Sequence, residues 1–255
     1  MITYSPEMAV AIQAAKSAGA FLKEHFDDTK KVDEESQNDI KIELDKLSQN
    51  LIMGIILGAF PEHSVLGEEG RAGNSGSDCE WIVDPIDGTV NYYYGIPWFC
   101  VSIALRRRGE IVLGVIYDPM MDECWHAEKG GPACKNGKVI SCSSRTKMAE
   151  AVVFVGHGKT DGSKEKGIER FAKVAWKVRK VRNNGSAALA MAYIACGRFD
   201  AYVESVISIW DIAAGKILVE AAGGTVILDP KPENPEQFAI IAWNGHIPIV
   251  ESLEE

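Results

Sequence analysis

The stretch Trp81-Ile-Val-Asp-Pro-Ile-Asp-Gly-Thr-Val-Asn91 carries two aspartates at the end of an apolar run. Its first three residues are typical of a short buried strand, and the Asp-Pro dipeptide favours an extended backbone at Asp84. Asp87 follows at the next turn, where Gly88 permits close backbone approach or a positive φ. The stretch therefore predicts two carboxylates at the end of a buried strand.

These two aspartates suit a hard divalent cation. Mg²⁺ prefers carboxylate and carbonyl oxygens, and here a peptide carbonyl lies between Asp84 and Asp87. The amides after Gly88 could open a helix whose positive end favours an anion, and the hydroxyl of Thr89 could orient a water molecule. Asp-Pro and Asp-Gly are also ordinary turn formers, so this stretch alone fits a metal and phosphate site or a plain turn.

Composition narrows the classes of function. The chain has 255 residues, enough for a sizeable core in one large domain or two packed lobes. A net charge of -9 argues against a bulk nucleic-acid or anionic-membrane partner, because either would favour a basic face. The N-terminal segment shows no export signal and no apolar run reaches membrane-spanning length. We therefore expect a cytoplasmic protein whose phosphate ligands need metal ions.

The six cysteines show neither zinc-site spacing nor a disulfide pattern, so we expect free thiols.

Helical periodicity dominates the start of the chain. An apolar stripe at spacings of three and four predicts a helix over residues 6–26, with Ser5 as its N-cap. Residues 27–39 are dense in charges and predict a solvated loop that could close over a metal site. A second helix ends near residue 60, and Asp45 lies off its expected buried stripe, formed by Leu44, Leu47, Leu51 and Ile55.

Paired acids follow in Gly67-Glu68-Glu69. Adjacent side chains on an extended chain point opposite ways, so one glutamate can face a metal. A charged turn is the alternative. A polar loop is expected over 71–80, then strands over 99–106, 111–117 and 123–126, and a hairpin turn at Asn136-Gly137.

The pattern then changes to alternating strands and helices. We expect an N-terminal α+β lobe, 1–145, with an antiparallel sheet and most metal ligands, and a C-terminal α/β lobe, 146–255, with a site between packed layers. Expected strands cover 152–155, 178–182, 201–204, 225–228 and 239–242, and expected helices cover 164–176, 186–196 and 210–222.

Three motifs in the same order and with similar separations resemble the inositol monophosphatase family. They are Gly67-Glu68-Glu69, Asp84-Pro-Ile-Asp-Gly-Thr89 with Asn91-Tyr92, and Trp210-Asp-Ile-Ala-Ala-Gly215. The resemblance implies an α+β fold, the layered αβαβα sandwich of the inositol monophosphatase and fructose-1,6-bisphosphatase type. It also implies a Mg²⁺-dependent, lithium-sensitive phosphomonoesterase that is a homodimer.

The resemblance also assigns roles to individual residues. Two or three Mg²⁺ ions would be held by Glu68, Asp84, Asp87, Asp211 and the main-chain carbonyl of Ile86. The catalytic residues would be Asp45, Glu68 and Thr89, of which Asp45 and Thr89 match positions that activate and orient the attacking water. The amides of Gly88 and Thr89 would cradle phosphate, and the alcohol part of the substrate would be surrounded by Asp87, Ser186, Ala187, Glu204 and Asp211.

The chain departs from the family pattern at two positions. Ile42 stands where a threonine is usual, and Glu34 where a lysine is common, which bears on loop closure and lithium sensitivity. The expected reaction is hydrolysis of a small phosphate monoester, with myo-inositol monophosphate as the first candidate. Alternatives are histidinol phosphate, fructose 1,6-bisphosphate or a 3'-phosphonucleotide, or a non-catalytic relative that binds metal or phosphate.

Overall fold

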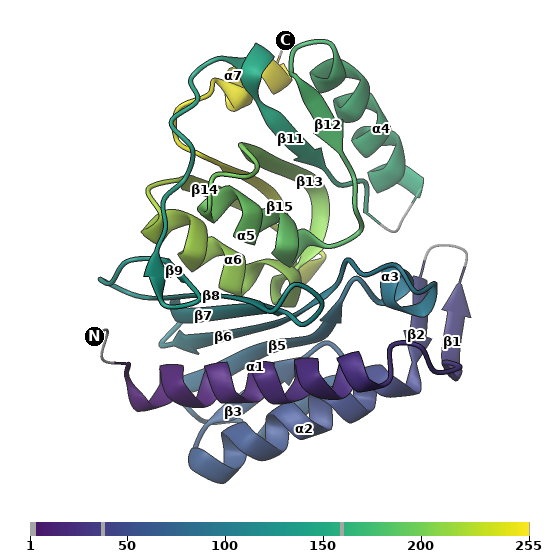
Figure 1. Ribbon diagram of the computed structural model, residues 1–255, viewed down its shortest axis with the longest axis vertical. Helices are drawn as coiled ribbons and strands as arrows, with labels where there is room; N and C mark the ends of the chain where they lie inside the picture. Colours follow the sequence, from purple (N-terminus) through teal and green to yellow (C-terminus); the bar gives the residue numbers. More distant parts are fainter. Residues whose placement is uncertain (1–3, 37–38, 159–160, 255) are drawn as a thin grey trace.

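The computed structural model describes residues 4–36, 39–158 and 161–254, which form five alternating layers of helices and sheets (Figure 1). Helices α1 (Pro6–Glu24) and α2 (Glu43–Ala59) cover one face of an eight-stranded sheet. Helices α5 (Ala187–Ala195) and α6 (Ile209–Ala221) separate that sheet from a five-stranded one. Helices α4 (Asp161–Ala175) and α7 (Ile249–Glu254) form the outer layer. The expected αβαβα sandwich is confirmed.

The first helix begins where its cap was expected. The Oγ of Ser5 accepts a hydrogen bond of 3.1 Å from the amide of Met8, and Pro6 occupies the first helical position. The buried stripe of α1 packs on the eight-stranded sheet, largely through alanines.

The second helix exposes the stripe that was expected to be buried. Leu47 is 46% exposed and Leu51 is 37% exposed, so the predicted face was wrong. The buried face is one position away and consists of Asp45, Ser48, Gln49, Ile52 and Ile56. The polar members of this face are buried because they support the neighbouring site: the Oγ of Ser48, for example, donates to the carbonyl of Pro85 at 3.3 Å.

The eight-stranded sheet has the order β10-β9-β8-β7-β6-β5-β3-β4 and is antiparallel except between β3 and β5. Its strands are β3 (Ser64–Gly67), β4 (Gly70–Gly73), β5 (Cys79–Asp87), β6 (Cys100–Arg107), β7 (Glu110–Asp118), β8 (Glu123–Glu128), β9 (Cys134–Lys135) and β10 (Lys138–Val139). The predicted meander and the Asn136-Gly137 hairpin are confirmed, and both turn residues have a positive φ. The loop predicted over 71–80 was wrong at β4, an exposed edge strand that has no apolar alternation to reveal it, and at Cys79 and Glu80, which begin β5.

The five-stranded sheet has the order β12-β11-β13-β15-β14. Its strands are β11 (Val152–Val155), β12 (Lys180–Arg182), β13 (Ala201–Ser208), β14 (Thr225–Lys231) and β15 (Asn234–Trp243), and a short 3-10 helix (Met148–Glu150) precedes β11. Strands β12, β11 and β13 are parallel, whereas β15 runs antiparallel to both of its neighbours.

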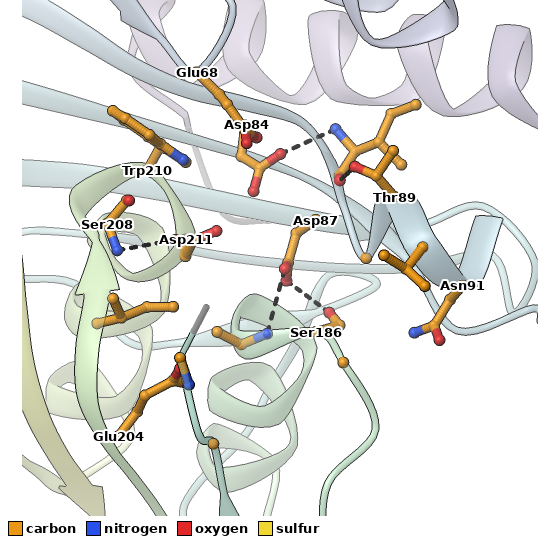
Figure 2. A pocket seen from close by; sticks show the side chains of 18 of the residues that line it. Glu68, Asp84, Asp87, Thr89, Asn91, Ser186, Glu204, Ser208, Trp210 and Asp211 are labelled. Carbon is orange, nitrogen blue, oxygen red and sulfur yellow. Dashed lines mark hydrogen bonds between the residues drawn. The ribbon is translucent and has the colours of Figure 1, made fainter. Parts of the chain in front are cut away.

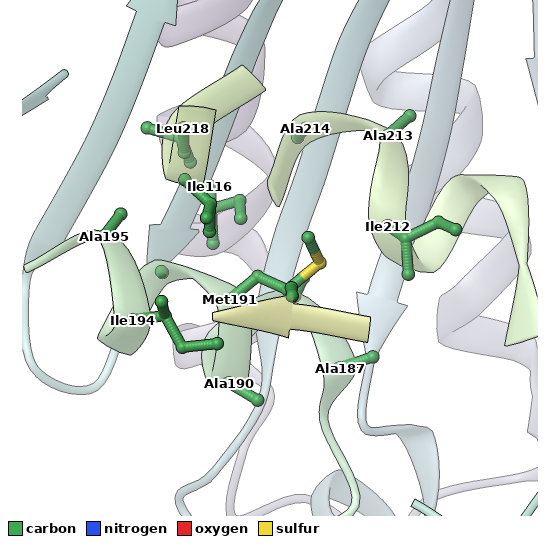
Figure 3. Packing of buried hydrophobic residues seen from close by; sticks show 14 of the residues in the cluster. Ile116, Ala187, Ala190, Met191, Ile194, Ala195, Ile212, Ala213, Ala214 and Leu218 are labelled. Carbon is green, nitrogen blue, oxygen red and sulfur yellow. The ribbon is translucent and has the colours of Figure 1, made fainter. Parts of the chain in front are cut away.

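The layer between the sheets packs through small residues (Figure 3). Met191 of α5 lies against Gly215 of α6, where an added Cβ would come within 2.6 Å of the methionine side chain. Gly114 of β7 similarly allows α6 to approach, because a Cβ there would lie 2.7 Å from the carbonyl oxygen of Ala214. These contacts bring the N-terminal ends of α5 and α6 to the edge of the first sheet.

The charged segment before α2 is not the expected loop throughout. It contains β1 (Val32–Ser36) and β2 (Asp39–Ile42), an antiparallel pair, while residues 37–38 lie outside the described residues. The strands were missed because, among the residues of β1 and β2 whose burial is described, Ile40 and Ile42 alone are buried. A short helix, α3 (Thr89–Tyr93), follows β5.

The cysteines are free thiols, as expected. Over the described ranges, no helix has the length and apolar character needed to span a bilayer.

Candidate active site

A cavity of about 650 Å³ opens where the layers meet, beside the end of β5 and the N-terminal ends of α3, α5 and α6 (Figure 2). It collects ten of the residues singled out from the sequence: Glu68, Asp84, Ile86, Asp87, Gly88, Thr89, Ser186, Ala187, Glu204 and Asp211. Asp45 is not among the lining residues but contacts one of them, Thr89. The structure thus brings together side chains that are far apart in the chain.

An irregularity in β5 directs the side chains of both of its aspartates toward the cavity. The register between β5 and β6 shifts between Asp84 and Asp87, which lets both carboxylates serve the same cavity. The Oδ1 of Asp84 accepts a 3.0 Å hydrogen bond from the amide of Ile86, whereas its Oδ2 is buried and has no hydrogen-bond partner among the described residues. A buried carboxylate oxygen without a partner is unfavourable unless a cation or proton compensates it.

Asp84 belongs to a compact acidic cluster. One carboxylate oxygen from each of Asp84, Asp87 and Asp211 lies within 4.8 Å of the others. Burial, followed by the charges of Glu68, Asp87 and Asp211, raises the pKa of Asp84 well above its usual value. A divalent cation would remove this repulsion and supply the missing partner for Oδ2. The donor set consists of hard oxygens, so it fits Mg²⁺.

The N-terminal end of α5 fixes the orientation of Asp87 (Figure 2). Its Oδ2 accepts hydrogen bonds from the hydroxyl of Ser186 at 2.6 Å and the amide of Ala188 at 2.7 Å, and its Oδ1 accepts from the amide of Ala187 at 3.3 Å. Burial raises the pKa of Asp87, and these donors partly offset that rise. Ser186 and Ala187, expected beside the substrate alcohol, therefore also position a proposed metal ligand.

Glu68 and Asp211 reach the cavity from different elements. Asp211 lies in the first turn of α6, and its Oδ2 accepts a 3.1 Å hydrogen bond from the amide of Ser208. Glu68 follows β3, and its amide donates to the carbonyl of Val83 at 3.1 Å, which ties this turn to β5. The adjacent Glu69 points to a different partner, as expected for neighbouring residues, and pairs with Lys41.

Sequence reasoning missed Lys41 and Gln49. The Nζ of Lys41 lies 2.8 Å from Glu69 Oε1, and Lys41 also lines the cavity. The Oε1 of Gln49 accepts a 2.9 Å hydrogen bond from the amide of Glu69, and its side chain occupies the space beside Gly67. Alternation in β2 was a weak signal for Lys41, but no pattern distinguished Gln49 from other polar residues on α2.

Asp45 is buried at the start of α2 beside Thr89. Its Oδ2 accepts a 2.8 Å hydrogen bond from the amide of Ile42, and the Oγ1 of Thr89 lies 3.4 Å from its Oδ1. The Thr89 hydroxyl also contacts the carbonyl of Ile86 at 2.9 Å. Burial raises the pKa of Asp45 to about 8, with smaller contributions from the charges of Glu68 and Glu69.

The far end of the cavity is built around Glu204. Its carboxylate accepts hydrogen bonds from the hydroxyl of Tyr202 and, at 2.8 Å, from the amide of Gly158. Gly156 permits this arrangement, because a Cβ there would lie 1.8 Å from Glu204 Oε2. Burial raises the pKa of Glu204, and the hydrogen bonds from Tyr202 and Gly158 oppose that rise.

Comparisons with known proteins agree with this architecture. The model of the inositol monophosphatase family matches residues 3–252. Inositol monophosphatase 2 of Solanum lycopersicum is 38% identical over 248 residues, which cover 93% of each chain. A protein named Nus factor SuhB of Xylella fastidiosa is 35% identical and covers 98% of this chain and 94% of its own. The crystal structure of extragenic suppressor protein suhB from Bartonella henselae has a TM-score of 0.90 and 34% identity, covering 98% of both chains.

Proposed function

Because the chain belongs to the inositol monophosphatase family and is a phosphoric monoester hydrolase, we propose that it hydrolyses a small phosphate monoester with the help of Mg²⁺. The first candidate substrate is myo-inositol monophosphate. One observation supports the metal requirement above others: Asp84 Oδ2 is buried without a partner inside a cluster of three aspartates.

The proposed ligands for Mg²⁺ are the side chains of Glu68, Asp84, Asp87 and Asp211 and the carbonyl of Ile86. Bound Mg²⁺ would neutralise charge on the phosphate and lower the pKa of water. The protein contributes ligands that are already oriented: α5 holds Asp87, the amide of Ser208 holds Asp211, and the amide of Ile86 holds Asp84. We propose two or three ions, as the family resemblance implies.

Asp45 and Thr89 are proposed to activate and orient the attacking water, together with Glu68. The Thr89 hydroxyl lies between Asp45 Oδ1 and the carbonyl of Ile86, so its rotation is restricted. The amides of Gly88 and Thr89 are proposed to donate to the phosphate. Gly88 has φ of 101°, a left-handed conformation that glycine adopts without strain, and this turns the backbone into α3.

The leaving-group end of the cavity favours an alcohol rich in hydroxyl groups. Glu204 offers a buried acceptor, and His157, Asn183 and Gln237 add further polar groups to the cavity wall. Lys41, at the metal end, is the one lysine or arginine among the described residues that line the cavity. The described part of the wall thus provides no guanidinium or ammonium group for a second phosphate at the leaving-group end. This supports a polyol monophosphate over fructose 1,6-bisphosphate or a bisphosphorylated nucleotide.

Phosphate release from a panel tests the proposal. The panel contains inositol 1-phosphate, histidinol phosphate, fructose 1,6-bisphosphate and 3'-phosphoadenosine 5'-phosphate, each with and without Mg²⁺. We expect Mg²⁺-dependent release with the highest kcat/KM for inositol 1-phosphate. Asp84→Asn is the control, and undiminished release by that variant would contradict the metal assignment. No release from any of the four compounds would favour a non-catalytic relative.

We also propose a cytoplasmic homodimer that lithium inhibits, built from lobes spanning residues 1–145 and 146–255. Light scattering on the purified chain measures its mass, and the phosphate-release assay repeated with Li⁺ measures inhibition. A monomeric mass, or full activity in the presence of Li⁺, would contradict the corresponding part.

A further inference from the structure

A second cavity, of about 370 Å³, lies at the end of β11 opposite to the active site. Its walls are formed by Arg145, Glu150, Val152, Arg179 and Arg198. Val152 is the first residue of β11, whereas Gly156, just beyond the last residue of that strand, lines the catalytic cavity. The two cavities therefore lie at opposite ends of one strand, and no residue described above as catalytic belongs to the second.

Two of the three arginines are fixed by the fold. The Nε of Arg145 donates to Asp200 Oδ1 at 2.8 Å, and its Nη2 donates to the carbonyl of Gly197 at 2.7 Å. Asp200 is fully buried and also accepts from the amide of Val152 at 2.7 Å, so it anchors this guanidinium to the start of β11. Neither bond uses the Nη1 of Arg145.

Arg198 is held equally firmly from the other sheet. Its Nη1 and Nη2 both donate to the carboxylate of Glu123 at 2.5 Å, and its guanidinium lies 4.5 Å from the centre of the Tyr193 ring. These bonds to Glu123 raise the pKa of Arg198 and leave its Nε outside the pair. A preorganised arginine loses less side-chain entropy when it binds a ligand than a mobile one does.

Arg179 differs from the other two arginines, because no carboxylate of the described residues pairs with its guanidinium group. Its backbone amide bonds to the carbonyl of Ala151 at 3.0 Å, but within residues 4–36, 39–158 and 161–254 its side chain has no carboxylate partner. Glu150 is the acidic residue of the cavity wall, and it lies 3.7 Å from Lys147. The cavity wall therefore carries three guanidinium groups, of which Asp200 and Glu123 offset two, and the charge of Arg179 is the one left for an anion in a chain whose net charge is -9.

Because three guanidinium groups meet at this cavity, we propose that the cavity lined by Arg145, Arg179 and Arg198 binds a small oxyanion. The oxyanion is either free phosphate or the phosphate group of a metabolite. Guanidinium groups match the planar oxygen pairs of phosphate and carboxylate, and their bonds to ionised acceptors are stronger than neutral ones. The volume is at the lower end of the roughly 300–1,000 Å³ range of ligand pockets, which suits a small ligand with its waters.

Calorimetric titration of the 255-residue chain tests this site. Inorganic phosphate is titrated with Mg²⁺ present, and again after the metal is removed by a chelator that is then dialysed away. Without metal, the catalytic cavity presents the carboxylates of Glu68, Asp84, Asp87 and Asp211 and repels anions. Binding that persists without metal is therefore expected to report the arginine cavity, whatever the catalytic activity of the chain.

Arg179→Gln is the decisive variant, because this side chain is exposed and forms no ion pair with a carboxylate of the described residues. We expect it to weaken metal-independent phosphate binding at least tenfold. Lys180→Gln removes the same charge from the next residue, which is outside the cavity, and is expected to bind as the unaltered chain does. Equal weakening in both variants, or no metal-independent binding in the unaltered chain, would overturn the proposal.

A parallel titration with inositol 1-phosphate, again without metal, identifies the source of the anion. Tighter binding than that of inorganic phosphate assigns the site to a phosphorylated metabolite, and weaker binding assigns it to free phosphate. Binding of either ligand that is insensitive to Arg179→Gln would contradict the assignment to this cavity.

Discussion

Asp87 depends on hydrogen-bond donors that come from the other side of the layer interface. The hydroxyl of Ser186 donates to its Oδ2 at 2.6 Å and thereby restricts the rotation of the carboxylate that clusters with Asp84 and Asp211. Partners that orient a metal ligand affect both metal affinity and activity, even when they do not touch the metal.

Ser186→Ala is expected to weaken Mg²⁺ binding by about 10- to 100-fold, the usual effect of losing such a partner. The measurement is the Mg²⁺ concentration that gives half-maximal phosphate release. Ser64→Ala is the matched control, because Ser64 is also nearly buried but donates to the carbonyl of Cys79, away from the acidic cluster. If both variants shift the Mg²⁺ requirement equally, the positioning role of Ser186 is wrong.

The raised pKa of Asp45 predicts how stability depends on pH. Its pKa is about 8 in the folded, metal-free chain, above the ordinary value of 3.8. Between these values the folded state holds a proton that the unfolded state has released, so the stabilisation is complete below the lower value and is lost as pH rises through the higher one.

The measurement is the free energy of unfolding in urea, without metal, from pH 5 to pH 9. We expect the unaltered chain to lose stability across this range. Asp45→Asn, which keeps the shape but cannot ionise, is expected to lose less. Parallel pH profiles for the two proteins would contradict the assigned titration.

Motifs predicted the residues of the site better than periodicity could. Glu68, Asp84, Asp87 and Asp211 were singled out because acids occurred in recognisable short patterns, and all four line one cavity. Lys41 and Gln49 were missed because their roles arise only after β2 and α2 pack beside the turn at Glu69. Their roles depend on tertiary contacts that leave no local signature.

At the level of helices and strands, small residues determine how closely α5 and α6 approach. Gly215→Ala would place a Cβ 2.6 Å from the Cβ and sulfur of Met191, and this interior has little free space. We expect a loss of roughly 1–3 kcal/mol in the free energy of unfolding, as is typical of overpacking.

Gly54→Ala is the matched control, since Gly54 is also helical but an added Cβ would meet nothing within 4 Å. It is expected to stabilise the chain by roughly 0.4–1 kcal/mol, because alanine restricts the unfolded chain and favours helix. Urea unfolding of both variants measures the difference. Equal changes in the two would show that packing against Met191 is not limiting.

Element type was predicted well where apolar residues repeat over a long segment, as in α1 and the β6 to β8 meander. The buried face of α2 was predicted wrongly because Ser48 and Gln49 face inward to bond the backbone of the site, while Leu47 and Leu51 face outward. Hydrophobic periodicity assumes that the buried face is apolar, and this assumption fails beside a polar site.

At the scale of the molecule, the acidic cluster is expected to make stability depend on metal. Mg²⁺ that binds only the folded chain is expected to stabilise it by about 2.7 kcal/mol at a concentration 100 times its Kd. Thermal unfolding with increasing Mg²⁺ measures this as a rise in Tm. Asp211→Asn is expected to reduce the rise, because it removes a carboxylate charge from the cluster.

NaCl added to the same ionic strength as the Mg²⁺ salt serves as the control for that titration. A rise in Tm that is the same in Na⁺, or that is undiminished in Asp211→Asn, would show that it reflects screening of the net charge of -9 and not a specific site.

The order of strands could not be obtained from local pattern. The parallel pairing of β3 with β5, and the antiparallel insertion of β15 between β13 and β14, join segments whose own sequences show only that they are strands. The layered sandwich was predicted through the family resemblance, which carries topological information that periodicity lacks.

The contact between Asp87 and the N-terminal end of α5 also has a consequence for protein synthesis. Asp84 and Asp87 leave the ribosome about a hundred residues before Ser186 and Ala188. A nascent chain that ends before Ser186 has two of the three clustered aspartates but lacks the hydroxyl and the two amides of α5 that orient Asp87. We therefore expect tight metal binding only after both halves of the chain have been synthesised and have packed together.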